Sequence, residues 1–238
     1  MIARVGLQGG ERPCCVKMLR HREQFEAEIR ARFVNGRALH SDVVVALWGW
    51  HTCVSEPLFT IDDSATGACI TPEPQRLSST EAEEYPFCIV MERGERSLHD
   101  ACSKERIAGV DSRAIVLAMR QVLQCLASLH AVGVVHGDVK QRNILRNASG
   151  AWMLCDMDAA ARVGTPIGAK TSTAYMPPEL ARCRYADGAA GHLERAESSF
   201  DVFSVGVVLF ELCSGPVKYA LDPLSCTASP AFWRPRMR

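Results

Sequence analysis

The change from strand-like to helix-like hydrophobic spacing along this chain constrains its fold most. In the first part, the short apolar runs at residues 14–19, 43–48 and 87–91 predict strands. In the second part, residues 112–131 place apolar side chains on one broad face, and residues 201–214 form a more uniformly apolar helix. Strands first and helices later predict an α+β fold in two lobes.

The segments between these runs predict the connections. Residues 1–20 predict two short strands joined by a turn, and residues 21–34 predict a helix that Asn35 and Gly36 end. Residues 54–84 are rich in Ser, Thr, Pro and acidic residues, and they predict a loop inserted between strands.

Composition argues against several classes of function. The 238 residues suffice for a sizeable core. The 27 Lys and Arg balance 27 Asp and Glu, so the chain has no net positive charge that would attract nucleic acid or a membrane surface. The 11 cysteines are odd in number and contain no C-x-x-C pair, which predicts reduced thiols. The N-terminal residues lack the apolar core of a signal peptide. We therefore expect an intracellular protein, assigned to the cytoplasm.

A run of chemically active residues follows the first long helix at residues 136–143, His-Gly-Asp-Val-Lys-Gln-Arg-Asn. Asp138 can accept the proton of an attacking hydroxyl, and Lys140 can neutralise a transferring phosphate. Asn143 offers a neutral oxygen to Mg²⁺, and Asp156, directly after an apolar run, offers a carboxylate. This combination predicts phosphoryl transfer.

Four segments resemble, in order, the motifs of protein kinases. Residues 136–143 resemble the catalytic loop H-R-D-x-x-x-x-N, with glycine in place of arginine, and residues 152–158 resemble the D-F-G segment, with Met-Asp in place of Phe-Gly. Residues 171–179 resemble the end of an activation segment, and residues 201–206 resemble the D-V-W-S-x-G start of a long helix. The chain is thereby similar to eukaryotic-type protein kinases, within their serine/threonine, tyrosine-kinase-like group.

The resemblance implies ATP and Mg²⁺ as cofactors and assigns a role to each matching residue. Lys17, at the end of a strand similar to V-A-I-K, would anchor the nucleotide phosphates with Glu28 as its partner, and Glu26 and Glu23 remain alternatives. Asp201 would accept amide hydrogens from the catalytic loop. The catalytic residues would be Asp138 and Lys140, the metal ligands Asn143 and Asp156, and the nucleotide-binding residues Lys17, Glu28, Cys15, Met91, Glu92, Gly94 and Leu145.

The resemblance also implies a partial domain. In the family, the Gly-rich loop ends roughly 15 residues or more before the strand lysine, and counting back from Lys17 reaches Ile2, so we do not expect this loop here. The helices expected after residues 201–214 do not appear either. We therefore expect a partial N-lobe with hinge over residues 1–94, a partial C-lobe over residues 95–220, and an irregular basic tail over residues 221–238.

Two single departures have chemical consequences. Gly137 replaces the arginine that would receive a phosphate of the activation segment, so we expect activity not to depend on phosphorylation at residues 171–173. Asp158 replaces a glycine, which predicts either a more restricted backbone or a second acid near the metal.

The function expected from these residues is transfer of the ATP γ-phosphoryl group to serine or threonine of a protein substrate. The alternative is a pseudokinase-like module that keeps the fold and acts as a scaffold or regulator. A small-molecule phosphotransferase is disfavoured, because residues 175–179 resemble the peptide-docking part of protein kinases. A regulatory partner that docks on residues 54–84 is a further candidate.

Overall fold

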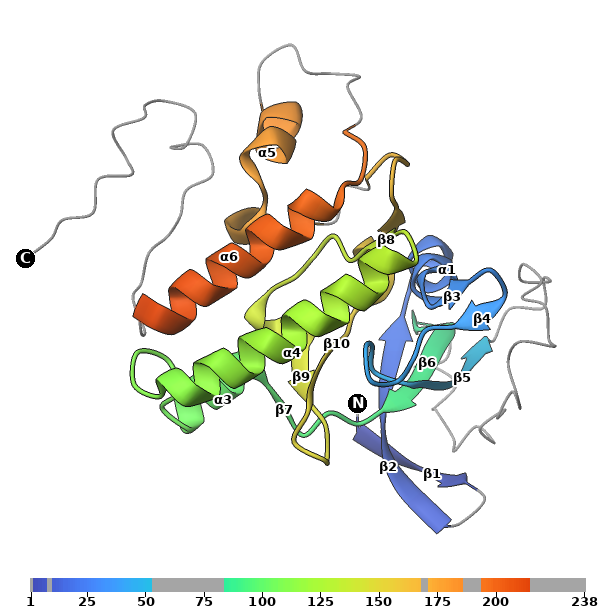
Figure 1. Cartoon of the computed structure of the whole chain (residues 1–238). Helices are drawn as coiled ribbons and strands as arrows, with labels where there is room; N and C mark the ends of the chain where they lie inside the picture. Colours follow the sequence, from blue (N-terminus) through green and yellow to red (C-terminus); the bar gives the residue numbers. More distant parts are fainter. Residues whose placement is uncertain (1, 8–9, 53–83, 168–170, 186–193, 215–238) are drawn as a thin grey trace, which may run out of the picture.

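The computed structural model describes residues 2–7, 10–52, 84–167, 171–185 and 194–214. These form two lobes, a smaller one built on a sheet and a larger, mainly helical one (Figure 1). The predicted α+β class is confirmed. The predicted inserted loop, apart from residue 84, and the predicted tail lie outside the described residues.

The smaller lobe is a four-stranded antiparallel sheet in the order β1-β2-β6-β5. Its strands are β1 (Ile2–Leu7), β2 (Gly10–Leu19), β5 (Leu47–Thr52) and β6 (Phe87–Glu92). Because β6 is a central strand, five successive residues of it are buried, which explains its unbroken apolar run. The two strands predicted over residues 1–20 are present.

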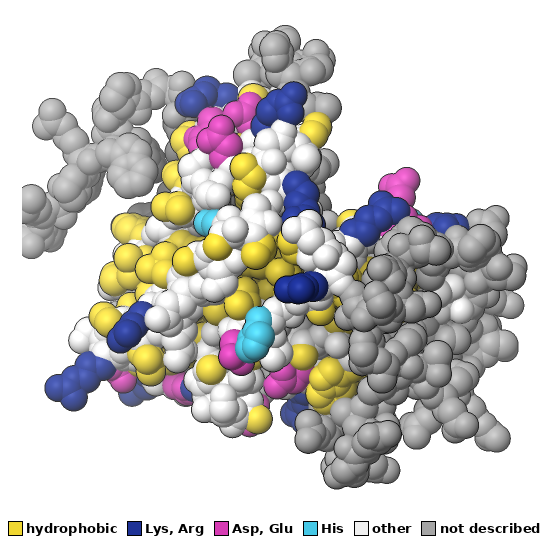
Figure 2. All heavy atoms as spheres, turned by 45° about the vertical axis from the view of Figure 1, so that its right-hand side comes forward, with side chains coloured by type: hydrophobic (Ala, Val, Ile, Leu, Met, Phe, Trp, Pro, Cys, Tyr) yellow, Lys and Arg dark blue, Asp and Glu magenta, His cyan; other side chains and the backbone are white. Residues whose placement is uncertain are grey.

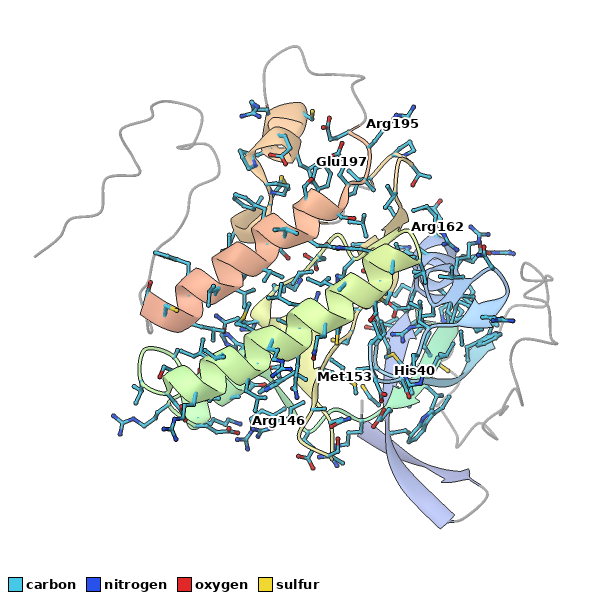
Figure 3. All side chains as sticks on the ribbon, in the orientation of Figure 1. His40, Arg146, Met153, Arg162, Arg195 and Glu197 are labelled. Carbon is cyan, nitrogen blue, oxygen red and sulfur yellow. The ribbon has the colours of Figure 1, made fainter. Side chains whose placement is uncertain are left out.

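Helix α1 (Arg22–Ala31) packs against this sheet and against the helical lobe. Phe25 and Ile29, one turn apart, are fully buried in the core of the smaller lobe. The Phe25 ring stacks on Phe87 of β6, with 5.1 Å between the ring centroids. Met153 of the helical lobe reaches into the same core, which joins the two lobes (Figure 3).

The predicted end of this helix is wrong. Helix α1 stops at Ala31, and β3 (Phe33–Val34) pairs with β4 (Arg37–Ala38) in a short hairpin. Asn35 and Gly36 have φ of 51° and 74°, so both lie in the left-handed region. Two such residues in succession match the tight hairpin turn that Asn-Gly favours, and the pair therefore joins two strands instead of capping a helix.

The strand predicted over residues 43–48 is displaced. The sheet strand β5 begins at Leu47, and the valines before it bond to the other lobe. Val45 N donates to the carbonyl oxygen of Leu154 at 2.9 Å, and Leu154 N donates to that of Val43 at 3.1 Å. The β-branched run thus has extended backbone, as its composition indicates, but it pairs across the lobe boundary.

The helical lobe is built on α4 (Ser112–Ala131) and α6 (Ser198–Ser214), which lie side by side (Figure 1). Both helices were predicted, and α4 has the predicted bounds. The side chain of Asp111 caps α4 by accepting from Ala114 N at 3.0 Å. Ser97 caps α3 (Leu98–Lys104) in the same way.

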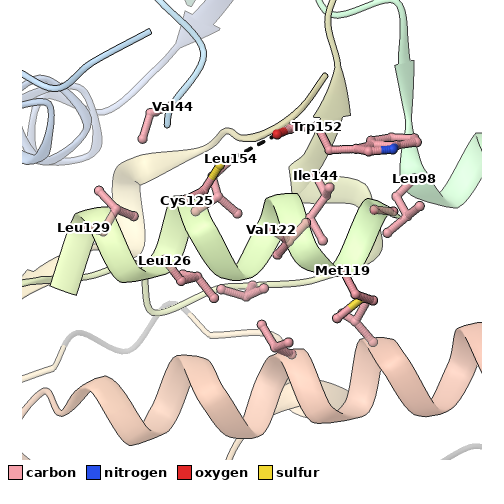
Figure 4. Close-up of a cluster of buried hydrophobic side chains, with 14 of the residues drawn as sticks. Val44, Leu98, Met119, Val122, Cys125, Leu126, Leu129, Ile144, Trp152 and Leu154 are labelled. Carbon is pink, nitrogen blue, oxygen red and sulfur yellow. Dashed lines mark hydrogen bonds between the residues drawn. The ribbon is translucent and has the colours of Figure 1, made fainter. Parts of the chain in front are cut away.

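The inner face of α4 forms the core of this lobe (Figure 4). Val122, Leu126 and Leu129 are buried there among side chains of α6 and of β10 (Trp152–Leu154). Of the helices described, α4 alone has the length and composition of a membrane span. Its buried stripe is also what the central helix of a folded domain requires.

Short elements connect these helices and carry the polar motifs. The strands β10, β9 (Ile144–Arg146) and β7 (Arg96–Ser97) form a small sheet, and β8 (Val134–Val135) pairs with β11 (Ala161–Arg162). The remaining elements are the 3₁₀ turns η2 (Gln141–Asn143), η3 (Met157–Ala159) and η4 (Thr173–Tyr175) and the helix α5 (Pro178–Tyr185).

Candidate active site

A cleft of about 830 Å³ lies between the lobes, which is the size of an ordinary ligand pocket. Strand β2 forms one wall, the connection after β6 forms the back, and residues around β9 and β10 form the opposite wall. The predicted residues among its lining are Cys15, Lys17, Met91, Glu92, Gly94, Asn143, Leu145 and Asp156.

Gly94 lets the connection between the lobes lie close to the opposite wall. A Cβ built on it would lie 2.9 Å from Cδ1 of Leu145, closer than a real contact permits. The two residues, both predicted to contact the nucleotide, thus lie against each other in the lining of the cleft.

Lys17 lies at the centre of a cluster of carboxylates from both lobes. Its Nζ is 2.9 Å from Oε2 of Glu28, forms an ion pair with Asp156, and lies 3.4 Å from Oδ2 of Asp158. The Asp156 pair joins residues 139 positions apart. The resemblance to kinase motifs implied the Glu28 pairing, and the Asp156 and Asp158 contacts depend on how the lobes pack.

The choice among the three candidate glutamates is decided by burial. Glu28 is fully buried on the inner face of α1, whereas Glu23 is exposed and Glu26 pairs with Arg22 and Arg30 on the same helix. Glu28 alone of these three pairs with Lys17 in the structure.

Arg32 is a second cation in the cluster, and the sequence interpretation missed it. Its Nη2 donates to Oε1 of Glu28 at 2.6 Å, and its Nη1 donates to the carbonyl oxygen of Val45 at 2.6 Å. The spacing of four residues between Glu28 and Arg32 on one helix was the available signal.

The charges shift the pKa of both members of the central pair. Burial alone would lower the pKa of Lys17, but the carboxylates of Glu28, Asp156 and Asp158 outweigh it and raise that pKa above its ordinary value. Burial likewise would raise the pKa of Glu28, but Arg32 and Lys17 hold it below its ordinary value. Both groups are therefore charged at neutral pH.

The loop before β9 holds Asp138, Lys140 and Asn143 together. Lys140 Nζ lies 2.6 Å from Oδ2 of Asp138 and donates to Oγ of Ser172 at 2.9 Å, and Ser172 N donates to Oδ1 of Asp138 at 2.9 Å. Asn143 Nδ2 donates to the Asp138 carbonyl oxygen at 2.9 Å. Because the amide nitrogen makes this bond, the amide oxygen is the atom that a cation would use.

Asp201, at the start of α6, organises this loop from beneath. Its fully buried carboxylate accepts from the backbone N–H groups of His136 at 2.8 Å and Gly137 at 2.9 Å, as the resemblance to kinase motifs implies. The ring of His130 lies 2.8 Å from the same carboxylate. The loop is thereby fixed to the core of the helical lobe.

The two polar loops are also bonded to each other. Cys155 N donates to the carbonyl oxygen of Asn143 at 2.9 Å, and the ring of His136 lies 3.0 Å from the Cys155 carbonyl oxygen. These contacts place Asn143 and Asp156 on the same wall of the cleft. Asp138 and Lys140 lie beside this wall and are not part of its lining.

The segment that carries Ser172 is held by α6. Tyr175 donates its hydroxyl hydrogen to Glu211 at 2.8 Å, and Ser204 donates to the Tyr175 carbonyl oxygen at 2.8 Å. Glu211 also accepts from Gln141 at 2.8 Å, so one carboxylate joins this segment to the turn η2.

The two lobes with a ligand-sized cleft between them have the arrangement of a protein kinase domain. The family model described as "Protein kinase domain" matches residues 74–224, which is more than half of the chain. The chain belongs to the protein kinase domain family.

Several curated protein kinases are similar to this chain. Mitogen-activated protein kinase kinase 10 of Arabidopsis thaliana is 36% identical over 134 residues, which cover 55% of this chain and 42% of that protein. Serine/threonine-protein kinase PknL of Mycobacterium tuberculosis is 36% identical over 114 residues, covering 46% and 26%. A dual serine/threonine and tyrosine protein kinase of Danio rerio is 27% identical over 153 residues, covering 61% and 15%. The matches span less than half the length of these relatives.

Proposed function

We propose that this chain transfers the γ-phosphoryl group of ATP to serine or threonine hydroxyls of a protein substrate. The observation that carries the proposal is the cluster around Lys17, which joins a buried glutamate of α1 to Asp156 across the cleft. A half-buried lysine amid three carboxylates is costly as a structural device alone, whereas it suits a site built for nucleotide phosphates.

The site residues divide the work of positioning and charge stabilisation. Asp138 would accept the proton of the substrate hydroxyl, and Lys140, 2.6 Å away, would offset charge on the transferring group. Lys17, held by Glu28, would contact the nucleotide phosphates. The adenine would lie against Cys15, Met91 and Leu145 and bond to the backbone from Glu92 to Gly94.

The donor set of the cleft fits a hard divalent cation. The Asp156 carboxylate and the Asn143 amide oxygen are the ligand types that Mg²⁺ prefers, and both residues line the cleft. When bound there, Mg²⁺ would neutralise charge on the phosphate oxygens. Asn143 and Asp156 are thus the proposed metal ligands.

A phosphorylation assay with a generic protein substrate tests this proposal. The wild-type chain should label serine and threonine, and Asp138→Asn should lower the rate by about 10²–10⁴, the usual contribution of a general base. Asp42→Asn is the matched control, because Asp42 is highly exposed and is not among the residues that line the cleft. Equal labelling by wild type and Asp138→Asn would remove the catalytic assignment, and label on tyrosine would correct the specificity.

A pseudokinase-like binding module is the second candidate, because Gly137 and Asp158 depart from the catalytic-loop and D-F-G motifs. Thermal unfolding with and without Mg·ATP separates binding from transfer. At 100 times Kd a ligand stabilises the folded state by about 2.7 kcal/mol. A shift of that size with no labelling of substrate would favour the scaffold function.

The remaining assignments follow from the proposed reaction. The partners are ATP and a protein substrate, in an intracellular and most simply cytoplasmic setting, with no role for nucleic acid or membranes. We divide the chain into an N-lobe with hinge over residues 1–94 and a C-lobe over residues 95–220. The regulatory partner predicted for residues 54–84 stays a prediction, because almost all of that segment lies outside the described residues.

A further inference from the structure

Asp158 stands where related kinase motifs carry glycine, and its carboxylate is fully buried between α1 and the cleft. Its Oδ2 accepts from Nε2 of Gln24 at 2.8 Å and lies 3.4 Å from Nζ of Lys17. The two-residue step from Asp156 to Asp158 thus links the cleft wall to helix α1.

Gln24 and Glu28 lie on the same face of α1, because they are four residues apart. Glu28 bonds to Lys17 and Arg32, and Gln24 bonds to Asp158 one turn earlier. Phe25 and Ile29 already hold α1 against the sheet of the smaller lobe, and the polar contacts fix it against the helical lobe. Two contacts a turn apart fix both its rotation and its distance from the cleft.

Helix α1 needs such contacts, because its local stabilisation is small. It has 10 residues, below the length at which helices are stable alone, and the side chain of its N-cap residue His21 makes no capping hydrogen bond. The turn η3 that carries Asp158 packs directly against it.

The charge balance explains why a neutral donor suits this position. The cluster holds three carboxylates, on Glu28, Asp156 and Asp158, and two cations, on Lys17 and Arg32. The amide of Gln24 stabilises the surplus carboxylate without drawing Lys17 away from the cleft.

We propose that Asp158 is a positioning residue that, through Gln24, anchors α1 to the segment carrying Asp156 and so keeps Glu28 paired with Lys17 in the resting protein. The benefit to nucleotide binding rests on the proposed kinase function, but the anchor itself does not. With this anchor, Glu28 stays paired with Lys17 although the activation segment carries no phosphate.

Hydrogen exchange of the nucleotide-free full chain tests the anchor. Gln24→Leu and Asp158→Ala should each speed exchange of the α1 amides by about tenfold, the effect of losing one hydrogen bond to a charged group. Exchange of α4 should not change. The double variant should exchange no faster than the faster single variant, because both changes remove the same contact.

Conservative replacement separates positioning from charge. Asp158→Asn keeps an oxygen that accepts from Gln24, so its α1 exchange should stay within about twofold of wild type. Glu23→Gln is the control on α1, because Glu23 is exposed on another face. Unchanged α1 exchange in both Gln24→Leu and Asp158→Ala, or single effects that multiply in the double variant, would overturn the proposal.

Adding Mg·ATP distinguishes failure of the anchor from failure of the kinase assignment. In Asp158→Ala, bound nucleotide should restore much of the α1 protection by holding Lys17 beside Glu28. If the nucleotide-free results hold and Mg·ATP changes nothing, the anchor stands and the nucleotide site is refuted.

Discussion

The backbone next to Asp138 leaves no room for an ordinary side chain. Gly137 has φ of 77°, and a Cβ built there would lie 2.6 Å from the carbonyl oxygen of Ala159. The same glycine donates its N–H to Asp201. The Asp201 bond on one side and the turn η3 on the other fix the backbone at this position. Glycine suits it because it tolerates the positive φ and has no Cβ to contact Ala159.

We expect Gly137→Ala to destabilise the chain by more than the 1–2 kcal/mol that a left-handed backbone costs an ordinary residue. The excess comes from the clash with Ala159. Denaturant unfolding measures it, with Gly150→Ala as control, because Gly150 has φ of 86° but nothing within 4 Å of its built Cβ. Equal losses in the two variants would contradict the close approach.

Ser172 should act through its hydroxyl and not as a phosphorylation switch. Its Oγ accepts from Lys140 and its N–H binds Asp138. We expect Ser172→Asp to lower kcat/KM by about 10–100-fold, because a carboxylate there would compete for Lys140 and repel Asp138. Ser172→Thr should retain most activity, and a Ser172→Asp variant that gained activity would refute this role.

At the scale of elements, α4 shows how one helix presents two different surfaces. Leu129 is fully buried between α6 and the strands, whereas Leu123 on the same helix is 48% exposed. Sequence spacing predicted both on one broad face, and packing confirmed only the first as core. The apolar stripe is wider than the surface that α6 and β10 cover.

This difference predicts unequal costs of truncation. Leu129→Ala should destabilise the chain by about 2–5 kcal/mol through lost burial and a residual cavity. Leu123→Ala should change stability by only about 0.5 kcal/mol or less, as surface substitutions usually do. The urea concentrations at the unfolding midpoints measure both stability changes, provided that the denaturant dependence of the unfolding free energy is the same in wild type and variants. Similar losses for the two leucines would contradict the packing of α4.

At the scale of the whole molecule, charge is spread over the surface and concentrated in the cleft. Lys, Arg, Asp and Glu side chains are scattered in small groups over the described part of the face in Figure 2, in keeping with the balanced composition. Buried charges lie in two places, around Glu28 at the lobe junction and at Asp138 and Asp201 in the helical lobe. The ion pairs between the lobes therefore depend on Lys17 and its carboxylate partners being charged.

Acid should weaken this junction. The pKa of Glu28 lies below its ordinary value in the folded chain, so its contribution is complete above that ordinary value and is lost as pH falls through the folded one. We expect stability to fall between about pH 4.5 and more acidic values, and Glu28→Gln to flatten this limb while lowering stability at pH 7. Thermal unfolding across pH 3–7 would measure both, and an unchanged acid limb in the variant would contradict the assignment.

Local sequence patterns were enough to predict most of the secondary structure and the chemical groups of the site. The spacing of apolar residues shows which face of an element is buried, and this predicted α4 and most of the strands. Asp138, Lys140 and Asn143 lie within six residues of one another, and this predicted that they act in one site. Folding settled whether the Asn35-Gly36 pair ends a helix or turns a hairpin, and it turns a hairpin. The local signals for a helix end and a hairpin turn share the same residues.

The tertiary structure also decided which groups meet across the lobes. The contacts of Lys17 with Asp156 and of Gln24 with Asp158 span more than 130 positions, and no local period encodes them. They depend on the distance and angle at which α1 and η3 pack, which are set by the summed burial of both cores. Residue types therefore specify what chemistry is available, and packing specifies which of those residues act together.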